Sequence, residues 1–202
     1  MDARLLESSG GTEVVVLPTA AAYEHPDRAV ATATKHFEAI GGTVRGVMAL
    51  RHADADEPAN VEAVRQARFL YLGGGSPLHL RSVLKATALL DALIEAWQGG
   101  AVLAGSSAGA MVLGDPMVDP RGGAFTLGLG LVKNLAVLPH ASGAIEHRTL
   151  RMAPPAVRLL SIPEQTAVVF DADGTVRADG ADPDGVVVHL GGQTIDLATQ
   201  VV

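Results

Sequence analysis

Two adjacent serines occupy a glycine-rich turn that could present a nucleophile. The stretch AVLAGSSAGAMVLG places Ser106 and Ser107 at the end of an apolar run and the start of a predicted helix. Within it, GSSAG matches the pattern G-x-S-x-G with Ser107 at its centre, and in that pattern a sharp strand-to-helix turn exposes the serine hydroxyl. The simpler interpretation is an ordinary turn in which Ser106 or Ser107 caps the helix. The sequence around the turn favours the nucleophile.

His140 is the candidate base, because a serine hydroxyl is a weak nucleophile until a base takes its proton. The histidine ends the apolar run NLAVLPH, which predicts a strand over residues 134–140. His147 is the main rival among the seven histidines, but it falls inside a predicted helix. The remaining histidines are better explained as surface or structural residues.

An acid is needed to orient the histidine, and two aspartates lie between the serine and the histidine in the chain. Asp119 is the preferred candidate, because Asp115 follows the short predicted helix so closely that its side chain could be tied to that turn. Both also fit Asp-Pro turns, and the sequence alone leaves either of these acids, or another, open.

The glycine run LGGGSP, with three glycines at positions 73–75, is suited to an oxyanion hole. Glycines let backbone N–H groups approach a reacting carbonyl closely, and the second donor would be the amide after the nucleophile, that of Ala108. A phosphate-binding loop is the weaker interpretation, because G-x-G-x-x-G is absent and the net charge of -7 is unfavourable.

Short aliphatic strands that alternate with helices would position these groups. Four apolar runs predict strands joined by helical crossovers and hence a parallel sheet with helices on both faces: Glu13–Thr19, Thr43–Leu50, Arg68–Leu72 and Ala101–Gly105. The glycine run, GSSAG and His140 each lie at the end of a predicted strand, which is where functional residues of open α/β sheets gather. After a Pro/Gly-rich loop or hairpin, the tail predicts antiparallel strands around Asp173-Gly174. A single domain over residues 1–202 is expected.

Composition narrows the function further. The chain of 202 residues has no cysteine, which excludes a thiol nucleophile and a thiolate zinc site, and no metal or cofactor is expected. Its negative charge and lack of a basic cluster argue against nucleic acid and anionic membranes, so a small molecule or peptide is the expected partner. No apolar run reaches membrane-spanning length and no leader is evident, which predicts a cytoplasmic protein. A homodimer is compatible with the sequence.

Three segments together resemble the dipeptidase E and cyanophycinase family of serine peptidases. These are YLGGGSPLHL, AVLAGSSAGAMVLG and LGLGLVKNLAVLPH, in that order, with SIPEQTAVVFDADGTVRADG resembling the C-terminal strands of the family. The resemblance implies the three-layer α/β sandwich of class I glutamine amidotransferases, flavodoxin-like, with a mostly parallel central sheet and an antiparallel C-terminal hairpin extension. It covers most of the chain. Ser76-Pro77 stands where the family often has Asn, or Asp then Gln.

The resemblance also implies an activity and a set of roles. Ser107 would be the nucleophile, His140 the base, and Gly75 and Ala108 the oxyanion donors. The third member of the triad varies in the family, so Asp119 is the acid chosen from the order of residues in the chain. Gly74 and Ser76 would contact a small peptide or amide substrate. Members like dipeptidase E act on peptides with an acidic residue, which needs a basic group; the candidates are Arg81, Arg121, Arg148 and Arg151. A catalytically silent, ligand-binding member of the same fold and an esterase with the same serine turn are the alternatives.

Overall fold

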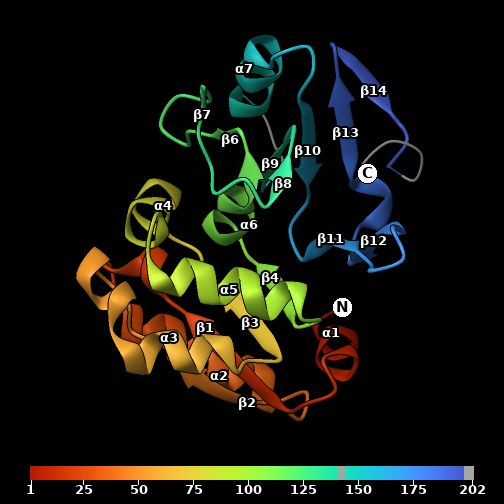
Figure 1. The fold of residues 1–202 in the computed structure, drawn as a ribbon. Coiled ribbons are helices and arrows are strands. Elements are labelled where there is room, and N and C mark those ends of the chain that lie inside the picture. The colour runs from red at the N-terminus through yellow and green to blue at the C-terminus, as the bar shows by residue number, and fades with distance from the viewer. Residues whose placement is uncertain (141–143, 198–202) are drawn as a thin grey trace. The chain divides into compact units, whose positions relative to one another are not determined.

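The computed structural model describes residues 1–140 and 144–197, with the side chains of 144–146 left aside (Figure 1). The chain divides into two compact units, residues 2–110 and residues 111–202 together with Met1. The single domain expected from the sequence stays a prediction. No helix in the described ranges is long and apolar enough to cross a bilayer.

A four-stranded parallel sheet forms the centre of the first unit. Its strands run in the order β2-β1-β3-β4, and they are β1 (Glu13–Leu17), β2 (Thr43–Gly46), β3 (Phe69–Leu72) and β4 (Val102–Gly105). Leu17 pairs with Leu72, and Leu72 with Gly105, so β1, β3 and β4 end level with one another. The loops that follow these strands therefore leave from one edge of the sheet. The parallel sheet predicted from the sequence is confirmed, although β2 stops at Gly46 rather than continuing to Leu50.

Helices cover both faces of this sheet, because the central strands are apolar on both faces. Val14 and Val16 of β1 pack with Phe37 and Phe69 on one face, while the alternate residue Val15 is buried on the other. The helices of this unit are α1 (Asp2–Ser8), α2 (Pro26–Glu38), α3 (Pro58–Arg65), α4 (Pro77–Leu84) and α5 (Ala88–Gln98), with 3-10 turns η1 (Thr19–Ala21) and η2 (His52–Asp56). The first unit is thus a three-layer α/β structure.

The chain passes from the first unit to the second within α6 (Ala108–Leu113). A six-stranded mixed sheet with the order β14-β13-β10-β9-β5-β8 forms the second unit. Its strands are β5 (Gly114–Asp115), β8 (Val132–Lys133), β9 (Leu135–Pro139), β10 (Arg158–Ile162), β13 (Val187–Leu190) and β14 (Gln193–Ile195). β9 and β10 are parallel, whereas β13 is antiparallel to both of its neighbours, β10 and β14.

Two small hairpins and a helix accompany this sheet in the described part of the second unit. β6 (Met117–Val118) pairs with β7 (Phe125–Thr126), and β11 (Thr166–Phe170) pairs with β12 (Val176–Gly180) around the predicted Asp173-Gly174 turn. The helix is α7 (Ala144–Met152), and a 3-10 turn, η3, spans Pro183–Gly185. Met111, Val118, Leu138 and Leu159 belong to its apolar core. The antiparallel C-terminal strands and the α/β class predicted from the sequence are confirmed.

Candidate functional site

The backbone at Ser107 has the geometry that the G-x-S-x-G pattern predicts. β4 ends at Gly105 and α6 begins at Ala108, so Ser107 lies in a two-residue turn between strand and helix. Its φ of 49° lies in the left-handed region, which non-glycine residues seldom adopt. Such strain persists where the surrounding structure enforces it, and it is concentrated at functional sites.

Two glycines on either side of the serine allow this turn to pack tightly. A Cβ atom on Gly105 would collide with the backbone of Gly109, and a Cβ on Gly109 would collide with the carbonyl group of Leu72 in β3. The first turn of α6 therefore lies directly against β3 and β4. Only glycine at both positions permits that approach without displacing the backbone.

Ser106 has a different environment from its neighbour. Its side chain hydrogen-bonds with the hydroxyl of Tyr71 on β3, and its backbone N–H donates to the carbonyl of Leu72 at 3.0 Å. Burial raises the pKa of the Tyr71 hydroxyl, and the bond with Ser106 opposes that rise. The Ser106 hydroxyl thus belongs to the packing between β3 and β4, which leaves Ser107 as the candidate nucleophile.

The glycine loop after β3 lies beside Ser107. A Cβ on Gly74 would stand 3.4 Å from the Cβ of Ser107. Gly75 has a φ of 133°, and a Cβ there would collide with the carbonyl of Ala20 in η1. In the described part of the chain the N–H groups of Gly74 and Gly75 meet no acceptor, whereas that of Gly73 donates to Leu17. Ala108 carries the first N–H of α6, where a helix supplies no internal partner.

The backbone N–H and the hydroxyl of Ser76 both form hydrogen bonds with neighbouring residues of the first unit. Its N–H donates to the carbonyl of Ala20 at 2.8 Å. Its hydroxyl caps α4 by accepting the N–H of His79 at 3.3 Å. The structure therefore gives Ser76 a local structural role, and its contact with substrate stays a prediction.

His140 follows β9 and hydrogen-bonds with a carboxylate that sequence analysis missed. Its Nδ1 lies 2.6 Å from Oε1 of Glu164, and both side chains are exposed. The pairing arises because β9 and β10 are parallel with Pro139 opposite Ile162, so the residues beyond both strand ends are neighbours. The segment SIPEQ carries the signal that could have found Glu164, namely an acid just after a strand. Like Ser107, His140 has a left-handed φ, of 56°.

The two aspartates predicted as acids are bound elsewhere in the second unit. Asp119 lies in the β6–β7 hairpin, where Arg121 donates from Nη2 at 2.6 Å and from Nε at 2.9 Å to its carboxylate. The Arg121 guanidinium lowers the pKa of Asp119 to about 2. Asp115 accepts the N–H of Gly128 at 3.2 Å.

The remaining predicted residues lie on helices. His147, Arg148 and Arg151 belong to α7, and Arg81 belongs to α4. His147 is exposed in α7, as its predicted helical position implied.

Each unit assembles one part of the predicted machinery. The first unit brings together Ser107, Gly74 and Gly75, and the second brings together His140 and Glu164. The partnership of Ser107 with His140 stays a prediction. Among the described residues, no three His, Cys, Asp or Glu side chains gather as metal ligands would.

Comparison with known proteins decides the family. The model of peptidase family S51 matches residues 2–177. The chain belongs to peptidase family S51. The resemblance to dipeptidase E and cyanophycinase is thereby confirmed, and the turn at Ser107 lies within the matched residues.

Curated S51-like relatives include cyanophycinases. Those of Synechococcus elongatus and Thermosynechococcus vestitus are each 30% identical to this chain over 192 residues, covering 86% of it and 58% of the relative. A cyanophycinase of Nostoc is 30% identical over 163 residues. The chain thus spans little more than half the length of these relatives.

Solved structures of similar proteins support the same fold. The crystal structure of a peptidase from an acI-B1 Actinobacterium has a TM-score of 0.80 and 29% identity, covering 100% of this chain and 88% of the other. A putative peptidase E from Listeria monocytogenes has a TM-score of 0.65 at 21% identity, covering 85% of this chain and 87% of the other, a likeness of fold alone.

Proposed function

We propose that this chain is a serine peptidase that cleaves amide bonds of short peptides through an acyl-enzyme. The observation that carries the proposal is Ser107, held at a left-handed φ between β4 and α6 with the Gly74 backbone against it. Membership of family S51 supports the same activity. The peptide substrate follows from the family, and its preferred residues are left to experiment.

The proposed reaction proceeds in two acyl transfers. Oγ of Ser107 attacks the amide carbonyl carbon while His140 takes the hydroxyl proton, and the C=O π pair moves onto oxygen. The N–H groups of Gly75 and Ala108 hold that oxyanion. The C–N bond then breaks as His140 donates the proton to the leaving amine. Water, deprotonated by His140, then attacks the ester carbonyl carbon. The bond between that carbon and Oγ breaks, His140 returns the proton to Oγ, and the carboxylic acid product leaves.

Glu164 is the acid we propose for orienting His140. Its carboxylate lies 2.6 Å from Nδ1, which is the position of the orienting acid in serine peptidases. Asp119 remains the acid predicted from chain order. Its bidentate contact with Arg121 favours the glutamate instead.

Labelling with a fluorophosphonate tests the activity. Such probes react with activated serine nucleophiles, so the wild-type chain should be labelled and Ser107→Ala should not. Ser106→Ala is the matched control, because its hydroxyl bonds to Tyr71 and should be dispensable for labelling. Mass spectrometry of the labelled peptide identifies the modified serine.

Failure to label the well-folded wild-type chain would favour the silent, ligand-binding alternative. Labelling that survives in Ser107→Ala would place the nucleophile elsewhere. A matched panel of peptide and ester substrates then separates a peptidase from an esterase, which uses the same serine turn. A peptidase should release amines from the amide members of the panel.

A further inference from the structure

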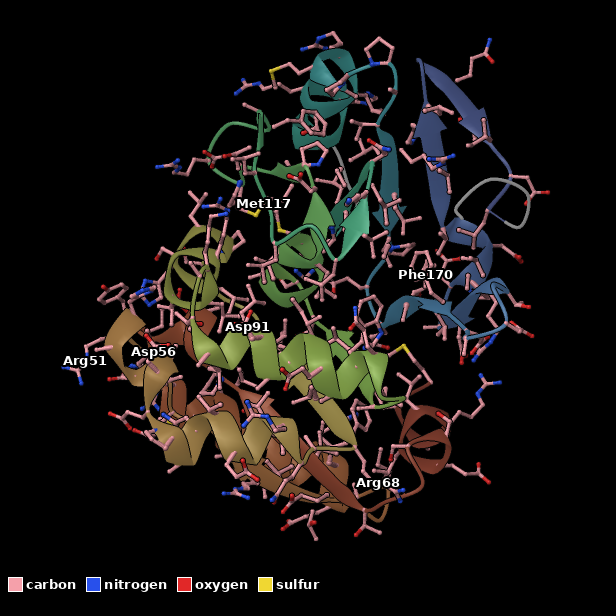
Figure 2. All side chains as sticks on the ribbon, in the orientation of Figure 1. Arg51, Asp56, Arg68, Asp91, Met117 and Phe170 are labelled. Carbon is pink, nitrogen blue, oxygen red and sulfur yellow. The ribbon has the colours of Figure 1, made fainter. Side chains whose placement is uncertain are left out.

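A cavity of about 540 Å³ opens at the same sheet edge as Ser107. Its walls come from the loops that follow β1 and β2, and we call it the edge cavity. The residues that define it are Tyr23, Met48, Leu50, Arg51, Asp54 and Glu57. Figure 2 shows Arg51 at this edge, with Arg68, which precedes β3, at the opposite end of the unit. The volume lies within the range of ligand pockets.

Two large apolar side chains on the edge cavity are open to solvent. Tyr23 is 85% exposed and Met48 is 37% exposed, which makes them two of the large apolar side chains that the described chain leaves open to solvent. Both line this one cavity. Exposed apolar groups that gather in a concave site mark binding surfaces, because covering them removes apolar area from water.

The charges on the rim are largely satisfied within the chain. Asp54 accepts the N–H groups of Leu50 at 3.0 Å and Arg51 at 2.9 Å, and the Arg51 guanidinium at 2.8 Å. The charges of Arg51 and Asp54 therefore balance one another. Among the lining residues this leaves the negative charge of Glu57. That remaining carboxylate disfavours an acidic occupant.

Direct contacts connect the edge cavity to the glycine loop after β3. Gly74 lies against Ser107, and Gly75 lies against Ala20, two residues before the cavity wall at Ala22. A second connection runs through His79 of α4, the helix that the glycine loop leads into. Its ring packs on Tyr23 with centroids 4.7 Å apart, and its Nε2 lies 2.9 Å from the carbonyl of Leu50.

We propose that the edge cavity binds an aromatic or large aliphatic side chain of the peptide substrate, at a position away from the cleaved bond. The inference rests on the proposed peptidase function and names a part of its substrate. An extended peptide advances about 3.3–3.6 Å per residue, so the peptide position that reaches the cavity reports its separation from the cleaved bond.

Binding to Ser107→Ala tests the proposal without turnover. The probes are blocked hexa-alanine peptides in which one phenylalanine is walked through the six positions, measured by calorimetry. At one position phenylalanine should tighten binding about ten-fold or more, as expected when most of an aromatic ring is buried. Tyr23→Ala in the same background should abolish that gain, and Tyr23→Phe, which keeps the ring, should retain it.

Trp97→Ala is the matched control. Trp97 is also a partly exposed large apolar residue of the first unit, at 38%, but it does not line the edge cavity. The gain should survive this change. The proposal is overturned if the gain in affinity persists in Tyr23→Ala. It is also overturned if arginine or glutamate tightens binding at that position and phenylalanine does not.

Turnover by the wild-type chain distinguishes this proposal from the proposed function. The phenylalanine peptide that binds best should have a kcat/KM about ten-fold above its alanine parent, and Tyr23→Ala should remove the difference. Equal kcat/KM values, with fluorophosphonate labelling of Ser107 intact, would overturn the edge-cavity proposal alone. Absence of labelling would overturn the peptidase function, whatever the peptides bind.

Discussion

Ser107 and its neighbour Ser106 have chemically identical side chains in different surroundings. Tyr71 engages the Ser106 hydroxyl, while the left-handed backbone at Ser107 places the next residue in the turn between strand and helix. Local pattern predicted this turn because G-x-S-x-G constrains consecutive residues. Glu164 could not be predicted in the same way, because its contact with His140 depends on the parallel pairing of β9 with β10.

The choice between Glu164 and Asp119 is a prediction at this scale. Glu164→Gln should lower kcat by about 10²- to 10⁴-fold, because an amide no longer stabilises the histidine in its charged form. Asp119→Asn should leave kcat close to that of the wild type, since its partner is Arg121. Steady-state kinetics on a peptide substrate measures both. The reverse ranking would restore Asp119 as the acid.

Arg121 should make the stability of the second unit depend on acidic pH. It holds the pKa of Asp119 at about 2, below the ordinary 3.8, so the native state releases the proton more readily than the unfolded state. The stabilisation is full above pH 3.8 and is lost as the pH falls through about 2. Urea unfolding of wild type and Arg121→Gln should show a stability difference that narrows over this range. A difference that is constant with pH would contradict the assignment.

At the scale of the elements, α6 packs directly on β3 because Gly109 has no side chain. Gly109 lets the helix lie against the Leu72 carbonyl, and Gly105 lets β4 approach the same helix. The strands were predictable because short aliphatic runs alternate with helices, but β2 ends early since residues 47–50 leave the sheet for the loop beside the edge cavity. Sequence analysis missed α1, whose seven residues carry no strong capping signal.

Gly109→Ala should therefore destabilise the protein by about 1–3 kcal/mol, because the new Cβ meets the Leu72 carbonyl. Helix propensity alone gives the opposite sign, since alanine in a helix interior is favoured over glycine by about 0.5–1 kcal/mol. Urea denaturation measures the free energy of unfolding. Gly122→Ala is the control, because a Cβ there has nothing within 4 Å. Stabilisation by Gly109→Ala would show that the helix does not lie against β3 as described.

At the scale of the whole molecule, the chain has two compact units, although a single domain was expected from the sequence. Length and composition could not reveal such a division, because the chain crosses from one unit to the other within α6 and no linker marks the change. Family membership, by contrast, was predictable, because the three matching segments surround Ser107 and His140 in a fixed order.

The expectation of one domain can be tested by unfolding. Trp97 is the only tryptophan, and it lies in the first unit, so its fluorescence reports the unfolding of residues 2–110. Far-UV circular dichroism reports both units. A single domain predicts coincident urea transitions with the two probes, and labelling at Ser107 should disappear over the same range. Two separated transitions would show that the units unfold independently.

The groups proposed to hold the oxyanion are backbone amides, and this has a consequence for evolvability. Substitution elsewhere leaves the amides of Gly74, Gly75 and Ala108 chemically unchanged, while substitution at Gly75 collides with Ala20. In a library randomised at positions 75 and 23 and selected for altered substrate preference, active variants should therefore keep glycine at position 75. They should carry many different residues at position 23, where the side chain is solvent-exposed. New substrate preferences can then accumulate by drift at the edge cavity while the turn that would carry the nucleophile is inherited unaltered.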